Sequence, residues 1–238
     1  MTDNSVQPGG DTDRQIARAG LLIGGLSIVA KLSAFAREAV IASLYGRGPE
    51  VDAFFLALAV PVFLLNLMAG AYQIALVPAW LAARRTDQGQ ADRIFQYSFL
   101  RLLVSLSIAA IVMAAAAPIY LPLVAPGLAP ETFRLAADML WVMVLFVVAG
   151  GGSIAWAGVL NAQRRFALPA IAPVLTPLVM AILLLVARDE LGISALAWGA
   201  VIGTALEAAI VGFALSRRGR PLLPKSTGAD LSSLRSRW

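Results

Sequence analysis

Six long runs of apolar residues dominate this chain and restrict it to a membrane fold. They cover residues 17–45, 52–82, 96–124, 132–160, 167–187 and 192–216. A bilayer core about 30 Å thick is spanned by a helix of about 20 apolar residues, so the sequence predicts an all-α integral membrane protein with six transmembrane helices. The hydrophobic share of 59% agrees with this, because soluble domains have about 45 to 50%.

The residue types argue against an enzyme. The chain has no Cys and no His, which excludes disulfides and thiolate metal sites and removes the commonest general base. We therefore expect no catalytic residues, no metal and no cofactor. The net charge is +5, but the basic residues lie beside the apolar runs and not on a water-facing domain. We therefore expect no nucleic-acid partner.

Lys and Arg are distributed unevenly among the connections, and this predicts the orientation. The tails and one set of loops hold Arg14, Arg18, Arg84, Arg85, Arg93, Arg164, Arg165, Arg217, Arg218, Arg220, Lys225, Arg235 and Arg237. The opposite loops hold only Arg47, Arg134 and Arg188. Cytoplasmic loops carry the excess of basic residues, so both termini are predicted to be cytoplasmic.

These patterns divide the chain into three parts. Residues 1–16 lack the pattern of a signal peptide and are predicted to be a disordered cytoplasmic tail. Residues 17–216 form the six-helix lobe, and residues 217–238 a basic cytoplasmic tail or a linker to an absent second lobe. Helix-breaking residues within the runs favour a bundle that bends: Pro61, Pro78, Gly150 to Gly152, Pro169, Pro173 and Pro177.

Charged residues in the first apolar run are the clearest functional signal. Lys31 and Glu38 are seven residues apart, so they share one face of a helix, and Arg37 neighbours that face. Snorkelling to the membrane surface is one explanation for the cations. The other is a polar cavity, where Lys31 and Arg37 would attract an anion such as phosphate or diphosphate.

Two acidic residues in other runs have two interpretations each. Asp52 begins the second run, where a carboxylate is favourable at a helix N-terminus, but it could also pair with Arg37 or act as a gate. Glu207 lies in the middle of the last run, where a lone carboxylate must be protonated or paired. It is either a proton or cation site or a packed residue without function.

Several collinear motifs resemble the MurJ/MviN family of lipid II flippases. They are K-x-x-x-F-A-R-E-A from Lys31, YGRGPEVDAFFLA from Tyr45, ALVP from Ala75, APGL from Ala125, GVLNAQRRFALPAIAP from Gly158 and LAWGAVIG from Leu196. The resemblance covers nearly the whole chain beyond residue 20.

This resemblance implies a fold and a function. The fold would be that of the multidrug, oligosaccharidyl-lipid and polysaccharide exporter superfamily, in which two six-helix lobes enclose a cavity. The cargo would be a polyprenyl diphosphate-linked saccharide, typically the peptidoglycan precursor lipid II, moved from the inner to the outer leaflet of the bacterial cytoplasmic membrane. It implies that Lys31 and Arg37 bind the diphosphate, with Asp52 and Glu38 as gating or ion-pair residues.

The chain departs from the family pattern in two ways. Leu65 and Asn66 stand where the family has an arginine, and the six runs correspond to one lobe. A second-lobe protein or a second copy of this chain would then be a partner. The alternatives are a transporter of another polyprenyl diphosphate-linked glycan or an amphipathic drug, and a non-transporting subunit that scaffolds or regulates cell-wall synthesis.

Overall fold

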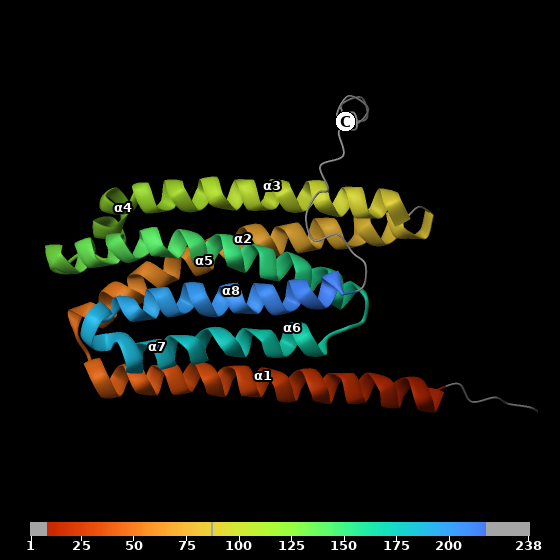
Figure 1. Cartoon of the computed structure of the whole chain (residues 1–238), viewed down its shortest axis with the longest axis horizontal. Coiled ribbons are helices and arrows are strands. Elements are labelled where there is room, and N and C mark those ends of the chain that lie inside the picture. Colours follow the sequence, from red (N-terminus) through yellow and green to blue (C-terminus); the bar gives the residue numbers. More distant parts are fainter. Residues whose placement is uncertain (1–8, 87, 218–238) are drawn as a thin grey trace, which may run out of the picture.

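The computed structural model describes residues 9–86 and 88–217, and these form a bundle of helices. The bounds of the helices are α1 Gly9–Tyr45, α2 Pro49–Thr86, α3 Gln88–Ala115, α4 Ala117–Val124, α5 Pro130–Ala162, α6 Ala167–Ile171, the 3₁₀ turn η1 Ala172–Val174, α7 Leu175–Leu191 and α8 Ser194–Ser216. The long helices lie side by side (Figure 1).

Helix α5 lies at the centre of the bundle. It packs against α2, α3 and α8, and α8 packs in turn against α7. Helix α1 lies at the edge, where it contacts α6, η1 and α7 and only grazes α2, its neighbour in sequence (Figure 1). The connection between α1 and α2 therefore takes the chain from one side of the bundle to the other.

The surface of the bundle is that of a membrane protein. Five helical segments are long and apolar enough to cross a bilayer: Pro49–Arg85, Gly89–Ala115, Pro130–Ala162, Ala167–Leu191 and Ser194–Ser216. Large apolar side chains on them are exposed, among them Ile74 at 79% and Val186 at 77%, which suits contact with lipid. Helix α1 is not one of the five, so the sixth span at 17–45 and the cytoplasmic termini stay predictions.

Two predicted boundaries are wrong. The run 96–124 is not one helix, because the chain turns at Ala116 and α4 starts afresh with Pro118 in its first turn. Proline fits in a first helical turn because the N–H groups of that turn make no intrahelical hydrogen bonds. The lack of an N–H on proline therefore costs no hydrogen bond there. The tail predicted for residues 1–16 is helical from Gly9 onward, and residues 1–8 and 218–238 lie outside the described residues.

The helix-breaking residues have different effects. The predicted span 167–187 is indeed interrupted, since α6, η1 and α7 follow one another and Pro173 lies in the 3₁₀ turn. By contrast, α2 continues through Pro61 and Pro78, and α5 continues through Gly150 to Gly152. These three glycines are buried against neighbouring helices, so in α5 they permit close packing and do not break the helix.

Candidate functional site

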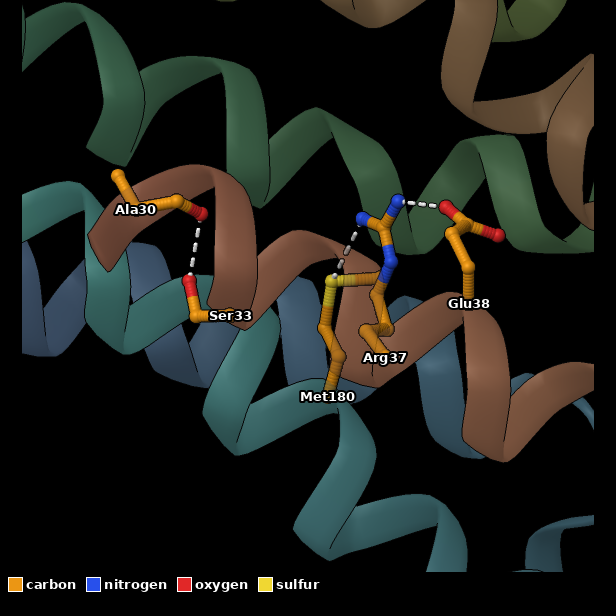
Figure 2. Close-up of polar contacts among 5 residues, drawn as sticks. All are labelled: Ala30, Ser33, Arg37, Glu38 and Met180. Carbon is orange, nitrogen blue, oxygen red and sulfur yellow. Dashed lines mark hydrogen bonds and ion pairs between the residues drawn. The ribbon is translucent and has the colours of Figure 1, made fainter. Parts of the chain in front are cut away.

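Arg37 and Glu38 form an ion pair on α1, close to α7 (Figure 2). The Nη2 atom of Arg37 donates to Oε1 of Glu38, and Nη1 donates to the sulfur of Met180 on α7 at 3.7 Å. The Arg37 side chain is 16% exposed and that of Glu38 is 41% exposed. The Nε atom of Arg37 is buried and has no hydrogen-bond partner among the described residues. The charge of the guanidinium is thus neutralised by Glu38, while its Nε–H is buried away from any ligand in this conformation.

Lys31 stands on an exposed face of α1. Ile28, Leu32 and Phe35 are 61%, 60% and 70% exposed, and they fall on the same stripe as Lys31 at helical spacing. Lys31 itself is exposed and has no ion pair within the described ranges. A lysine among apolar side chains in the membrane is unfavourable unless water or a polar ligand reaches it.

Asp52 does not pair with Arg37 in this conformation, because Arg37 pairs with Glu38. Asp52 is exposed in the first turn of α2, where its backbone N–H donates to the Gly48 carbonyl at 3.2 Å. Glu38, Arg47 and Asp52 line an open pocket of 610 Å³ at the turn between α1 and α2. The three residues therefore lie around one hollow at the α1–α2 end of the bundle.

Glu207 on α8 joins three helices through hydroxyl groups. Ser153 on α5 donates to its Oε1 at 2.8 Å, and Thr176 on α7 donates to its Oε2 at 3.3 Å. The hydroxyl of Thr204 lies 3.2 Å from that of Thr176. Glu207 has no cationic partner within the described ranges.

Leu65 takes part in the core and not in a polar cavity. Its side chain is 6% exposed and packs against Gly150 of α5, where an added Cβ would lie 2.8 Å from a Leu65 methyl group. The neighbouring Asn66 is exposed. The position where the resemblance places an arginine is thus a packing contact in this lobe.

The structure separates the predicted site residues into two groups. Glu38 and Asp52 line the hollow at the α1–α2 turn, Arg37 pairs with Glu38, and Lys31 is exposed on the same helix α1, whereas Glu207 lies between α5, α7 and α8. The sequence had drawn attention to Glu207 but not to its partners Ser153, Thr176 and Thr204. Their only sequence signal is that each is a small polar residue inside an apolar run.

Sequence comparisons place this chain beside one family of transporters. A family model described as lipid II flippase MurJ matches residues 41–237. The lipid II flippase MurJ of Burkholderia cenocepacia is 32% identical over 197 residues, which is 80% of this chain and 38% of that protein. The probable lipid II flippase MurJ of Synechocystis sp. is 30% identical over 190 residues, 79% of this chain and 35% of that protein. The chain spans less than two fifths of these relatives' length.

Solved structures share the fold. The inward closed conformation of a lipid II flippase MurJ superposes with a TM-score of 0.72 at 19% identity, covering 83% of this chain and 42% of that one. An outward-facing multidrug resistance MATE family transporter of the MOP superfamily gives a TM-score of 0.70 at 18% identity, covering 95% of this chain and 50% of that one. The all-α bundle is therefore the fold of about half of such a transporter.

Proposed function

Because the chain belongs to the lipid II flippase MurJ family, we propose that it is one lobe of a flippase for a polyprenyl diphosphate-linked saccharide, lipid II in the first instance. It would work in the bacterial cytoplasmic membrane by alternating access, supplying precursor for peptidoglycan synthesis, and it would transport without catalysis. The family match carries this proposal. The 35% to 38% coverage of the relatives supports a second lobe, or a second copy of this chain, as the partner.

The face of α1 has the chemistry that such a cargo needs. Lys31 supplies a cation that has no ion pair among the described residues and lies in an apolar stripe, and Arg37 supplies a guanidinium whose Nη groups contact Glu38 and Met180. A guanidinium binds phosphate oxygens through paired hydrogen bonds, and exposed Ile28, Leu32 and Phe35 offer surface to a lipid chain. We infer that the diphosphate binds at Lys31 and Arg37 and that Glu38 holds Arg37 while the site is empty.

Glu38 and Asp52 would then act as gating residues. Glu38 would leave Arg37 when an anion arrives, and Asp52 lies in the same hollow at the α1–α2 turn. Moving the α1–α2 turn would bring Asp52 toward Arg37 or away from it. The bend at η1, against which α1 packs, is the break that would allow α1 to move relative to α5 and α8.

A different cargo is the second candidate, and Leu65 favours it. Because Leu65 is packed into the core at the position of the family's arginine, this lobe has one cation fewer for a diphosphate. Another polyprenyl diphosphate-linked glycan, or an amphipathic molecule with less charge, would need fewer cations.

Complementation tests the proposal. The chain, alone and together with the second lobe of a related flippase, is expressed in a strain depleted of its own lipid II flippase, and growth is scored. We expect rescue with the second lobe and loss of rescue by Lys31→Ala and by Arg37→Ala. Arg134→Ala is the matched control, because it removes an exposed cation near the start of α5 and not on α1.

Two results would contradict the proposal in different ways. Rescue by both α1 variants at normal membrane levels would remove Lys31 and Arg37 from the cargo site. Failure of the paired lobes to translocate lipid II in vesicles, when they do translocate another lipid diphosphate, would favour the second candidate. If the paired lobes translocate neither lipid II nor another lipid diphosphate, the chain would be a subunit without transport activity.

A further inference from the structure

Glu207 is a carboxylate inside a membrane-spanning helix whose described partners are all hydroxyl groups. It lies near the middle of α8, where no other Asp, Glu, Lys or Arg occurs between Ser194 and Ser216. An isolated carboxylate at membrane depth is unfavourable unless its charge is neutralised. Ser and Thr hydroxyls stabilise it, but they carry no charge to neutralise it.

Charged residues on the helices around Glu207 are engaged elsewhere or lie toward helix ends. On α5 they are Glu131, Arg134 and Asp138 in the first three turns, and on α7 they are Arg188, Asp189 and Glu190 in the last turn. On α2 they are Glu50, Asp52, Arg84 and Arg85, all at its two ends. On α1, Arg37 approaches α7 but pairs with Glu38. Lys31 lies on the exposed face of α1, and no described cation forms an ion pair with Glu207.

The oxygen atoms around Glu207 are arranged for a small ligand. The Ser153 contact at 2.8 Å has the length of a good hydrogen bond, and it fixes Oε1. The Oε2 atom and the hydroxyls of Thr176 and Thr204 are spaced at 3.3 Å and 3.2 Å, longer than the usual O–H···O distance of about 2.7 to 2.8 Å. The Thr176 hydroxyl thus lies between Oε2 and the Thr204 hydroxyl and makes only long hydrogen bonds to both.

We propose that Glu207, Ser153, Thr176 and Thr204 bind a small monovalent cation, either a proton or Na⁺, which neutralises the carboxylate. Glu207 supplies the charge, Thr176 supplies a neutral oxygen beside Oε2, Thr204 supplies another beside the Thr176 hydroxyl, and Ser153 orients the carboxylate. Hydroxyl groups suit both ions, because an oxygen lone pair can coordinate Na⁺ or accept a hydrogen bond from a protonated carboxyl group.

The position of Thr176 gives this site a mechanical role. Thr176 is the second residue of α7, directly after the 3₁₀ turn η1, and so it lies at the break in the 167–191 segment. Through Glu207 it is tied to α5 and α8. A bound cation would therefore stabilise the bent arrangement of η1, which also contacts α1. This role rests on the proposed transport function, whereas binding of the cation does not.

A stability measurement tests Na⁺ binding. The purified full chain in detergent is unfolded by heat in NaCl and in choline chloride at equal ionic strength. If Na⁺ is the ligand, we expect the midpoint to rise in NaCl by at least about 2 °C, because a ligand that binds the folded state stabilises it. The rise should be absent in Glu207→Gln and reduced in Thr176→Val. Glu131→Gln, which alters an exposed carboxylate of α5, should keep it.

Infrared difference spectroscopy tests the proton. In Na⁺-free buffer at neutral pH, a protonated Glu207 gives a carboxylic-acid carbonyl band that Glu207→Gln removes and Glu131→Gln retains. Ser153→Ala, which removes the closest hydrogen bond, should shift that band, and this provides a second test if Glu207→Gln does not fold. Either the Na⁺ effect or the acid band supports the proposal.

An ionised Glu207 without any Na⁺ effect would overturn it. Neither measurement uses cargo or a second lobe. If both measurements fail to detect a cation, the flippase proposal still stands. If complementation fails, the proposed cation site still stands.

Discussion

Gly203 of α8 lies directly against the backbone of Thr176 of α7, so close that a Cβ at residue 203 would be 2.6 Å from the Thr176 Cα. The same contact repeats one turn away, where a Cβ on Gly199 would be 2.6 Å from the Cα of Met180. Small residues four apart let two helices approach closely in a membrane. This contact sets the distance between α7 and α8, and with it the position of Thr176 beside Glu207.

Gly203→Ala and Gly199→Ala should therefore destabilise the fold. The added methyl meets backbone and not a movable side chain, so we expect a loss of about 1 to 3 kcal/mol or more in the free energy of unfolding. Unfolding in detergent by sodium dodecyl sulfate measures it. Gly70→Ala is the control, because nothing lies within 4 Å of its Cβ position, and alanine there should stabilise α2 by up to about 1 kcal/mol. Equal effects at residues 70 and 203 would contradict the close approach of α7 and α8.

Gly151→Ala should be partly rescued by a change at Leu106. A Cβ at residue 151 would lie 2.1 Å from a methyl group of Leu106, which is fully buried on α3. Leu106→Ala alone should cost about 2 to 5 kcal/mol through its cavity, and the double variant should cost less than the sum of the two single changes. A double-mutant cycle of unfolding free energies measures this coupling. Strict additivity would mean that the two residues are not in contact.

Trp156 should tolerate phenylalanine but not alanine. Its ring stacks on Phe99 at 5.2 Å between centroids and lies against Gly212, so it fills space between α3, α5 and α8. The indole Nε1 is buried without a hydrogen-bond partner in the described part of the chain, so Trp156→Phe removes no hydrogen bond. We expect a cost below about 1.5 kcal/mol for Trp156→Phe and about 3 to 5 kcal/mol for Trp156→Ala, measured by the same unfolding assay. A cost for Trp156→Phe well above about 1.5 kcal/mol would contradict the absence of a partner for the indole N–H.

Glu38→Gln should strengthen binding of an anionic lipid. In this conformation Glu38 forms an ion pair with the guanidinium of Arg37. Because the Glu38 side chain is 41% exposed, this ion pair is worth about 0.5 to 1 kcal/mol. Removing that competitor should raise the affinity for a fluorescent polyprenyl diphosphate about two- to fivefold, as followed by fluorescence anisotropy. Glu50→Gln, in the first turn of α2, is the matched carboxylate control. Unchanged or weaker binding by Glu38→Gln would argue against Arg37 as a diphosphate ligand.

Apolar run length predicted where most of the helices lie, because the bilayer imposes it on any spanning segment. The runs 132–160 and 192–216 correspond closely to α5 and α8. The turn at Ala116 was missed because the apolar character of the sequence continues across it without interruption. From the sequence alone, Gly150 to Gly152 favour a bend, yet a glycine in a helix either loosens it or admits a neighbour, and only the packing of Leu65 and Leu106 decides which.

The candidate site could be predicted only as a set of residue types. Charges within apolar runs stand out in any sequence, and for this reason Lys31, Arg37 and Glu207 could be selected. Their partners depend on which helices meet: the neighbour of Arg37 on α7 is Met180, and Glu207 meets hydroxyls from two other helices. Helix contacts of this kind follow from the packing of α1 on α7 and of α8 on α5 and α7, which neither spacing nor hydropathy encodes.

The placement of α1 at the edge of the bundle also bears on how the chain is made. Arg37 and Met180 are separated by 143 residues, so at a synthesis rate of about 5 to 20 residues per second α1 leaves the ribosome about 7 to 30 s before its main packing partner. Helix α1 makes few contacts with α2, so α2 offers it little stabilisation before α7 is made. During this interval α1 lacks the contacts that it later makes with α6, η1 and α7. The order of synthesis, as well as the finished fold, therefore bears on which residues this helix can carry.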